Sequence, residues 1–270
     1  MYLTRHVTSD GPRWAVDGQF LPPAFSLRLL LALPASARRT LASMTTEEPA
    51  SGDLLAPLEA DHEVWACGVT YLRSRQARQA ESVVGDVYAR VYDAERPELF
   101  FKAAGWRVVA NGAGIRIRGD SAWNVPEPEL VLAINRLGEI VGYCAGNDVS
   151  SRSIEGENPL YLPQAKVYTG ACALGPGLVL VEAASPGDLP IRLEIRRKGE
   201  AVFQAQTQTS QMKRRLDELV TYLYRELDFP HGVFLMTGTG IVPGEDFTLQ
   251  AGDHVSVTVG ELTLQNDVYS

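Results

Sequence analysis

The sequence predicts a β-rich α+β fold, and three observations support this class. Beyond residue 98 the chain holds many short apolar stretches bounded by Gly, Pro, Asn and Asp, as in strands joined by turns. Residues 211–227 instead space their leucines and a valine along one helical face. No internal repeat or low-complexity tract is present. Runs of strands interrupted by a helix belong to the α+β class.

The first part of the chain is expected to form a small N-terminal domain. Residues 14–16 resemble a strand, and residues 34–42 have helical propensity. A polar loop over residues 45–53, which contains Pro and Gly, follows them. We therefore expect an N-terminal domain over residues 1–58 and a catalytic domain over residues 59–270.

Elements of the second domain follow from local pattern. Residues 64–69 are apolar enough for a buried strand, and residues 72–89, rich in Arg, Gln, Ala and Glu, favour a helix. The later strands are predicted over residues 99–101, 115–117, 129–134, 140–145, 178–181, 191–196, 201–204, 233–236, 254–259 and 262–264.

Composition excludes several classes of protein. With 270 residues, 45% of them hydrophobic, the chain can bury a full core. A net charge of -8 and a pI near 5.1 argue against a nucleic acid or an anionic membrane as partner. The apolar run at 27–33 is too short to span a bilayer, and no secretory leader pattern opens the chain. Cys67, Cys144 and Cys172 lack metal-ligand spacing, which favours buried thiols and a cytoplasmic location.

A divalent-metal site is predicted around residues 127–148. Glu127 and Glu129 share one face of a predicted strand, because successive strand side chains alternate. A hairpin through the turn at 137–139 returns Asp148 to the same place. Three clustered carboxylates repel one another unless a cation lies among them. Their hard oxygen atoms suit Mg²⁺ first, or Mn²⁺, better than zinc.

The neighbouring segment strengthens this interpretation. A Glu-x-Glu pair alone is more often a solvated strand face than a metal site. Here Arg152, Glu155 and Lys166 follow in a polar loop with almost no apolar periodicity, beside two apolar strands. A loop of this kind is typical of a functional site.

Two other segments are candidates for binding. Arg73, Arg75 and Arg78 lie within two turns of the helix expected after Tyr71, where they form either a solvated face or a grip on an anionic substrate. Thr239 lies in a Gly-Thr-Gly loop that follows a strand, a loop that allows close approach of backbone to ligand or is simply a turn. No nucleotide-binding motif, serine elbow or histidine within the polar loop is present, which argues against serine or cysteine hydrolase chemistry.

From about Trp65 onward the chain resembles the fumarylacetoacetate hydrolase superfamily. The resemblance rests on Pro-Glu127-Pro-Glu129-Leu, Gly-Asn-Asp148-Val-Ser-Ser-Arg152, Lys166 before Gly-Ala-Cys-Ala-Leu-Gly-Pro, and Met-Thr-Gly-Thr239-Gly. It implies a mixed β-roll, a homodimer or homotetramer, and Mg²⁺ or Mn²⁺ held at Glu127, Glu129 and Asp148. It also implies 2-oxo acid substrates chelated by the metal, with Lys166 beside them.

One departure from the family pattern narrows the expected reaction. Hydrolytic members carry a water-activating histidine shortly after the tyrosine that matches Tyr71, whereas here no histidine lies between His62 and His231. Residues 68–78, 95–102 and 154–166 look closer to one branch, the 2-dehydro-3-deoxy-D-pentonate dehydratases. That branch converts 2-dehydro-3-deoxy-D-arabinonate, a 2-keto-3-deoxy sugar acid, to 2,5-dioxopentanoate and water in oxidative pentose degradation.

The expected roles follow from this chemistry. Lys166 is expected to act as base or enolate stabiliser, and Glu155 as the second acid or base. The substrate's carboxylate and hydroxyls are expected to be held by Arg152, Tyr71, Arg75 and Thr239. The alternatives are an acylpyruvate hydrolase, decarboxylase or hydratase of the same superfamily, or a non-catalytic protein that binds anions through the arginines at 73–78.

Overall fold

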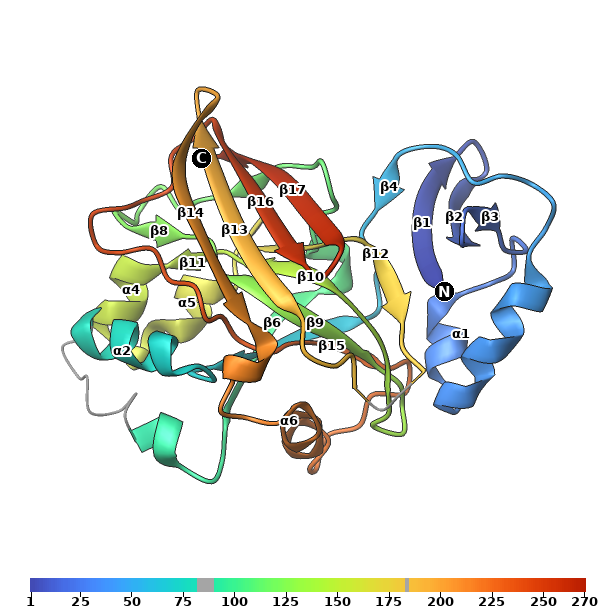
Figure 1. Cartoon of the computed structure of the whole chain (residues 1–270), viewed down its shortest axis with the longest axis horizontal. Helices are drawn as coiled ribbons and strands as arrows, with labels where there is room; N and C mark the ends of the chain where they lie inside the picture. The colour runs from blue at the N-terminus through green and yellow to red at the C-terminus, as the bar shows by residue number, and fades with distance from the viewer. Residues whose placement is uncertain (82–89, 183–184) are drawn as a thin grey trace.

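The computed structural model describes residues 1–81, 90–182 and 185–270. A long curled sheet packs against a five-stranded sheet (Figure 1). Neighbouring strands of the long sheet are β3 (Gln19–Phe20), β2 (Gly11–Val16), β1 (Tyr2–Thr8), β12 (Cys172–Leu180), β10 (Ile140–Asp148), β9 (Pro128–Ile134), β15 (Val233–Met236), β5 (Glu63–Gly68) and β6 (Glu98–Ala104), with β4 (Leu54–Leu55) beside β1. The second sheet contains β14 (Glu200–Gln208), β13 (Pro190–Arg197), β16 (Asp253–Val259), β17 (Leu262–Tyr269) and β7 (Ile115–Arg116).

The pairing makes this a mixed fold. Most neighbours are antiparallel, but β15 runs parallel to β5, and β17 runs parallel to β7. Strand β9 is buried at every residue, because the sheet is covered on both faces there. Strands β16 and β17 alternate between buried and more exposed residues, which places the core between the two sheets. The predicted β-rich α+β class and mixed β-roll are confirmed.

The long sheet curls enough to bring distant strands together. Lys102 on β6 forms an ion pair with Asp148 at the end of β10, although β9, β15 and β5 lie between these two strands. A flat sheet would hold the two side chains well apart, since neighbouring strands are about 4.8 Å apart. The curl therefore makes the roll and closes it around a small interior region.

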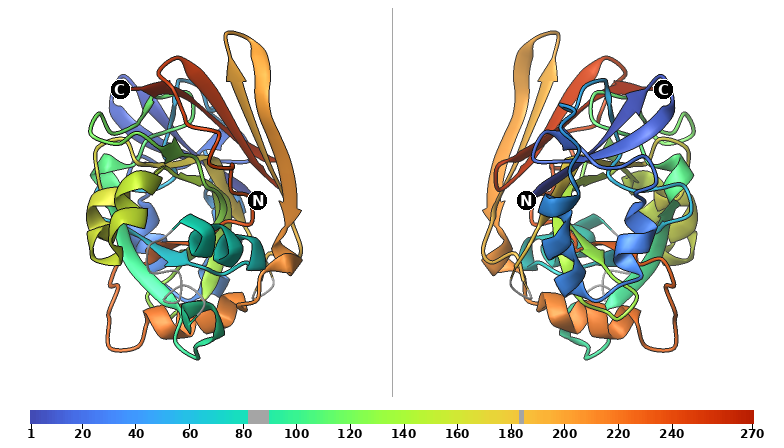
Figure 2. Two further views of the ribbon diagram at one scale, coloured as in Figure 1. Left: turned by 90° about the vertical axis from the view of Figure 1, so that its left-hand side faces the viewer. Right: turned by 90° about the vertical axis from the view of Figure 1, so that its right-hand side faces the viewer.

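Helices are short and lie at the edges of the sheets. The helical segments are α1 (Leu27–Leu31), η1 (Ala35–Met44), α2 (Leu72–Glu81), η2 (Gly105–Arg107), α4 (Arg152–Glu157), η3 (Pro159–Tyr161), α5 (Leu162–Lys166), η4 (Thr209–Gln211) and α6 (Leu216–Leu223). Helices α2, α4 and α5 gather on one side of the long sheet, opposite the N-terminal strands (Figures 1 and 2). Within the parts of the chain that the structure describes, no helix is long and apolar enough to cross a membrane.

Most predicted strands are present, whereas the predicted helices differ. The helix expected over 34–42 is the 3₁₀ segment η1, and the helix expected over 211–227 is only α6. Tertiary hydrogen bonds explain the shortening, because Met212 forms a β-bridge with Tyr71 and the Lys213 amide donates to the Thr70 carbonyl at 2.9 Å. Helix α2 is described as far as Glu81, and the expected remainder at 82–89 lies outside the described residues.

Two further expectations concern larger segments. The expected polar loop over residues 152–166 folds into α4, η3 and α5, so the prediction of a loop there was wrong. Residues 1–58 contribute β1 to β4, and β1 pairs with β12, with Tyr2 opposite Val179. The sheet is thus continuous across the expected boundary at residue 58, and that boundary stays a prediction.

Candidate metal and active site

The site lies at one end of five neighbouring strands. Asp148 ends β10, Glu129 lies near the start of β9, Gly238 follows β15, Gly68 ends β5, and Glu98 starts β6. Because β10 and β15 run antiparallel to β9, and β5 runs parallel to β15 but antiparallel to β6, these positions fall at the same edge. Strand topology alone therefore brings together residues that are up to 170 positions apart in the sequence.

Three buried carboxylates form the centre of the site. Glu127, Glu129 and Asp148 are 3%, 1% and 1% exposed, and each offers an oxygen within 4.8 Å of the others. The β9–β10 hairpin sets this geometry, since Glu129 lies opposite Gly146 and the Asp148 amide donates to the Glu127 carbonyl at 2.9 Å. The convergence expected from strand period is confirmed. Three hard oxygen donors so close together fit a Mg²⁺ or Mn²⁺ ion.

Glu129 is a buried carboxylate whose ionised form a bound cation would stabilise. Burial, with added repulsion from Asp148 and Glu127, raises the pKa of Glu129 well above its ordinary value. Its Oε2 accepts a hydrogen bond from the Gly238 amide at 2.6 Å. Gly238 has φ +93°, and a Cβ there would lie 2.1 Å from the Thr70 hydroxyl, so only glycine fits. The glycine turn after β15 thus serves to hold a predicted metal ligand.

Three buried cations surround the carboxylates. Lys166 Nζ donates to Glu127 Oε2 at 2.8 Å, to Asp148 Oδ2 at 3.0 Å and to Ser150 Oγ at 2.6 Å. Arg152 Nη2 lies 2.9 Å from Glu127 Oε1. Lys102 Nζ pairs with Asp148 Oδ1 and donates to the carbonyls of Val149 at 3.2 Å and Lys166 at 2.5 Å. Buried charges need such partners, because an unpaired ion in the interior costs several kcal/mol.

A narrow cavity of about 10 Å³ opens onto this centre. It is lined by Glu127, Arg152, Lys166 and Thr239, together with residues from the end of β5, from α2 and from β6: Cys67, Gly68, Val69, Ser74 and Phe100. A cavity of this size is at the lower limit for one water molecule. A five-carbon acid must therefore displace some of the lining side chains when it binds.

Of the predicted binding residues, Arg152 and Thr239 line the cavity, whereas Tyr71 is buried but is not among the lining residues. Tyr71 is 1% exposed, and its hydroxyl has no hydrogen-bond partner within the described residues. Burial, with the carboxylates of Glu129 and Asp188, raises the pKa of Tyr71. Thr239 lines the cavity, but its hydroxyl bonds to the backbone of Ile241.

Two other predicted residues lie further out. The Arg75 guanidinium is 5.2 Å from the Tyr92 ring centre and 3.9 Å from an Asp93 carboxylate oxygen. Within the described residues, Arg75 is not among those that line the cavity. Glu155 is buried and lies 3.6 Å from Arg152, and it is not among the described residues that line the cavity. The contact that the structure describes for Glu155 is with Arg152, which suits a role in holding that guanidinium in place.

Sequence reasoning missed Glu98, Lys102 and Ser150. The Glu98 carboxylate occupies the space over Gly68, where a Cβ would lie 1.8 Å from Glu98 Oε2. Lys102 is 1% exposed and follows the apolar residues 99–101. A charged residue directly after a predicted apolar strand was the available signal for Lys102, and it is a weak one. Ser150 gave no signal beyond its position two residues after Asp148.

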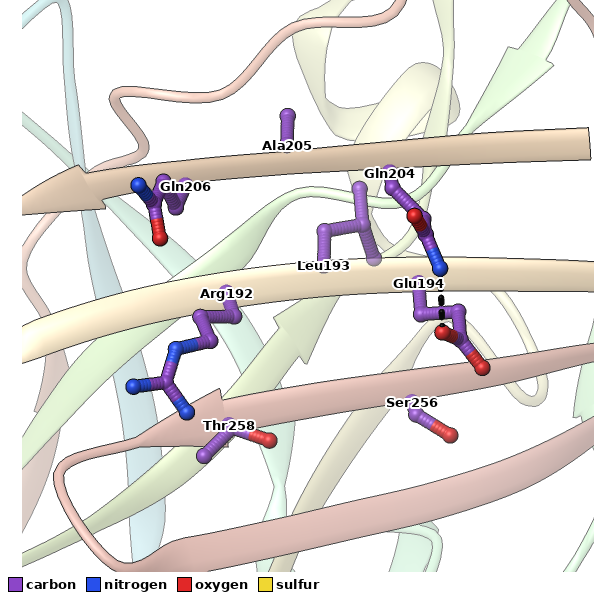
Figure 3. Close-up of a pocket in the computed structure, with 8 residues that line it drawn as sticks. All are labelled: Arg192, Leu193, Glu194, Gln204, Ala205, Gln206, Ser256 and Thr258. Atoms are coloured by element: carbon purple, nitrogen blue, oxygen red, sulfur yellow. Dashed lines mark hydrogen bonds between the residues drawn. The ribbon is translucent and has the colours of Figure 1, made fainter. Parts of the chain in front are cut away.

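A larger groove elsewhere does not share this chemistry. It lies on the outward face of β13, β14 and β16 and has a volume of about 570 Å³. Figure 3 shows the residues that line it. Gln204 donates to Glu194 at 2.6 Å within it, and Arg192 projects along its edge (Figure 3). Among the described residues its lining includes one carboxylate and no metal-ligand cluster. The small buried cavity, and not this groove, carries the candidate active site.

A mixed β-roll with a buried carboxylate centre defines a metal-dependent enzyme. The family model "Fumarylacetoacetate (FAA) hydrolase C-terminal" matches residues 63–269. The chain therefore belongs to the fumarylacetoacetate hydrolase family.

Three similar proteins are named as dehydratases of 2-keto-3-deoxy pentonates. Over 214 residues the chain is 53% identical to the probable 2-keto-3-deoxyxylonate dehydratase of Haloferax volcanii, covering 78% of this chain and 73% of that protein. It is 43% identical over 205 residues to the 2-dehydro-3-deoxy-D-arabinonate dehydratase of Saccharolobus solfataricus, covering 74% and 69%. A solved 2-keto-3-deoxy-D-arabinonate dehydratase complexed with magnesium and 2,5-dioxopentanoate matches with TM-score 0.80 and 34% identity, covering 99% and 98%.

Proposed function

We propose that this chain is a Mg²⁺-dependent dehydratase that converts 2-dehydro-3-deoxy-D-arabinonate to 2,5-dioxopentanoate and water. The observation that carries the proposal is the buried Glu127–Glu129–Asp148 centre in a chain 53% and 43% identical to two dehydratases of this class. The cavity lining also includes no histidine among the described residues, which disfavours water activation for hydrolysis.

The reaction sets the number of proton-handling groups. One C3 proton must leave, and the C4 hydroxyl must depart as water. A C5 proton must then move to C3, and the resulting enol must gain a proton at C4 and lose its hydroxyl proton to give the aldehyde. When bound by Glu127, Glu129 and Asp148, Mg²⁺ supplies Lewis-acid polarisation of the keto group and stabilises the negative charge that develops there. The remaining tasks fall to side chains of the protein.

Lys166 and Arg152 suit two of these tasks. Lys166 reaches the carboxylate centre and lines the cavity, where it handles a proton or stabilises an enolate through its charge. Arg152 lines the cavity beside Glu127 and suits a bidentate grip on the substrate carboxylate. Tyr71, Thr239 and Arg75 remain proposed contacts for the hydroxyls.

The second acid or base has two candidates. Glu155 is the residue expected from sequence, and it contacts Arg152. Glu98 lies over Gly68, which lines the cavity. Glu98→Gln and Glu155→Gln separate them: the acid or base loses kcat on the order of 10²-fold or more, whereas a residue that only holds Arg152 mainly raises KM.

Product analysis tests the proposed function. The protein is incubated with Mg²⁺ and a panel of 2-keto-3-deoxy sugar acids, and 2,5-dioxopentanoate, pyruvate and CO₂ are measured. We expect 2,5-dioxopentanoate from the pentonate and no turnover in excess EDTA. Pyruvate together with an aldehyde would instead identify aldol cleavage, and CO₂ would identify a decarboxylase. No product from any of these acids would favour the rival enzymes of the superfamily, and absence of Mg²⁺ binding would favour the anion-binding protein.

The assembly and location of the enzyme remain proposals. We infer a homodimer or homotetramer from the family resemblance and a cytoplasmic location from three free, buried cysteines. Light scattering after size-exclusion chromatography measures the assembly, and a monomer at micromolar concentration would contradict it.

A further inference from the structure

Ser150 lies at the junction of the carboxylate centre and Lys166. It belongs to β11 (Ser150–Ser151), which pairs with β8 (Asn124–Val125) next to α4 and α5 (Figure 1). The Ser150 side chain is fully buried. Its hydroxyl donates to the Asp148 carbonyl at 2.9 Å and accepts from Lys166 Nζ at 2.6 Å. Because a carbonyl cannot donate, the single hydroxyl proton is committed, and the oxygen faces Lys166 as an acceptor.

The other two acceptors of Lys166 have a competing task. Both Glu127 Oε2 and Asp148 Oδ2 belong to predicted metal ligands, and a bound cation draws on the same carboxylates. Of these three acceptors, Ser150 is the one that does not belong to a predicted metal ligand. Its contact with Lys166 is also the shortest of the three.

A lysine that handles a proton needs a fixed amine. Its four-carbon stem is flexible, and proton transfer requires donor and acceptor atoms about 2.6–3.2 Å apart. The backbone of Lys166 lies at the end of α5, where its carbonyl accepts a hydrogen bond from Lys102 Nζ. This hydrogen bond fixes the backbone and not the amine. Fixing the amine itself requires an acceptor near Nζ that stays in place when the metal binds.

We propose that Ser150 is a positioning residue that orients the Lys166 amine toward the substrate in the metal-loaded enzyme. This inference rests on the proposed dehydratase function. Ser150 is neither a predicted metal ligand nor one of the residues that line the cavity, so it acts through Lys166, which lines it.

Adjacent Ser151 offers a matched control. It is fully buried on the same short strand, and its hydroxyl donates to Ser121 Oγ at 2.7 Å, away from Lys166. Ser150→Ala and Ser151→Ala therefore remove the same group from neighbouring positions of equal burial. We expect Ser150→Ala to lower kcat about 10-fold, as is common when a group that orients an active-site residue is lost, with KM and Mg²⁺ affinity within about twofold. Ser151→Ala is expected to retain kcat within about twofold.

A double-mutant cycle with Lys166→Ala decides whether Ser150 acts through the lysine. If it does, Ser150→Ala causes no further loss in the Lys166→Ala background. An equal loss in both backgrounds, or an unchanged kcat in Ser150→Ala, would overturn the proposal. A parallel fall in Mg²⁺ affinity, measured by calorimetry, would also overturn it by showing that the hydroxyl serves Asp148 instead. Failure of the proposed function is distinct, because the unmodified enzyme would then form no 2,5-dioxopentanoate.

Discussion

At the scale of single residues, the site is a balance of buried charges. Three carboxylates lie within 4.8 Å of one another, and Lys166, Arg152 and Lys102 pair with two of them. Glu129 differs, since its described hydrogen bond comes from the neutral Gly238 amide. The metal-free protein thus keeps one carboxylate whose ionised form is unfavourable, which is consistent with the raised pKa of Glu129.

Replacing Glu129 with glutamine should therefore have opposite effects on metal-free and metal-loaded protein. A raised pKa in the folded state means that ionised Glu129 destabilises the fold at neutral pH. Glu129→Gln removes this charge and keeps an oxygen for the Gly238 amide, so the metal-free melting temperature should rise by a few degrees, about 2–4 °C per kcal/mol. The stabilisation by Mg²⁺ should disappear together with activity.

Thermal melts with and without Mg²⁺ check this prediction. Glu200→Gln, at an exposed position on β14, serves as the control and should leave both melting temperatures within about a degree. A Glu129→Gln protein that Mg²⁺ still stabilises as much as the original would exclude Glu129 as a ligand.

At the scale of elements, turns and strand ends hold the functional atoms. The turn after β15 aims the Gly238 amide at Glu129, and its φ of +93° admits only glycine without strain. Gly252 provides a comparison, because its φ is +89° but a Cβ there would meet nothing within 4 Å.

Gly238→Ala should cost more stability than Gly252→Ala. Each substitution pays left-handed backbone strain of about 1–2 kcal/mol, but only Gly238→Ala also drives a methyl group to within 2.1 Å of the Thr70 hydroxyl. We expect urea unfolding to show the larger loss for Gly238→Ala, and calorimetry to show weaker Mg²⁺ binding for that variant alone. Equal losses of stability in the two variants would mean that the Thr70 side chain moves away from the added methyl group at little cost.

A second element, helix α1, depends on the Glu59 carboxylate. This carboxylate accepts hydrogen bonds from the amides of Leu27 and Arg28 at the start of α1, from the Ser26 hydroxyl and from Trp14 Nε1. Burial alone would raise the pKa of Glu59, but these hydrogen bonds outweigh it and the pKa lies below its ordinary value. Glu59 also lies near Asp61 and His62, yet its oxygens are engaged by these donors.

Stability should consequently depend on Glu59 in a defined pH window. A depressed folded-state pKa adds stability above the unfolded value near 4.3, and this contribution is lost as pH falls through the folded value. Glu59→Gln should cost about 1–3 kcal/mol at pH 7, and the difference from the original protein should shrink below pH 4. Urea unfolding at pH 7 and pH 3.5 measures this difference in stability. A difference that is the same at both pH values would contradict a stabilising role for ionised Glu59 at the start of α1.

These elements also show what sequence could and could not provide. Glu127, Glu129 and Asp148 were predictable because strand period and one hairpin determine their positions. Lys102 and Glu98 were not, because they reach the site through the curl of a sheet with three strands between β6 and β10. Arg75 pointed elsewhere because Tyr92 and Asp93, distant in sequence, attract its guanidinium.

At the scale of the whole molecule, one sheet links the N-terminal strands to the site. Strand β1 pairs with β12, which pairs with β10, and β10 ends at Asp148. Leu3 on β1 is fully buried opposite Leu178, within the same apolar core as β9 and β10. We therefore expect residues 1–58 to unfold together with the rest of the chain.

Leu3→Ala tests this cooperativity. Loss of a buried leucine side chain should cost about 2–5 kcal/mol and shift a single unfolding transition, whether it is followed by tryptophan fluorescence or by loss of activity. Leu29→Ala, at a leucine that is 58% exposed on α1, is the control and should shift it little. Two transitions, only one of them moved by Leu3→Ala, would instead establish an independent N-terminal domain.

The pairing of Lys102 with Asp148 across the curl has a consequence for how the enzyme survives stress. The two residues are 46 positions apart in sequence and meet only when β6, β5, β15, β9 and β10 are all in register, so the predicted metal ligands acquire this buried partner only in the complete fold. A ligand that binds only the complete fold stabilises it by mass action, by about 2.7 kcal/mol when its concentration is 100 times its dissociation constant. The magnesium concentration would then set not only the rate of turnover but also the stability of the folded chain, and removal of the metal would lower both.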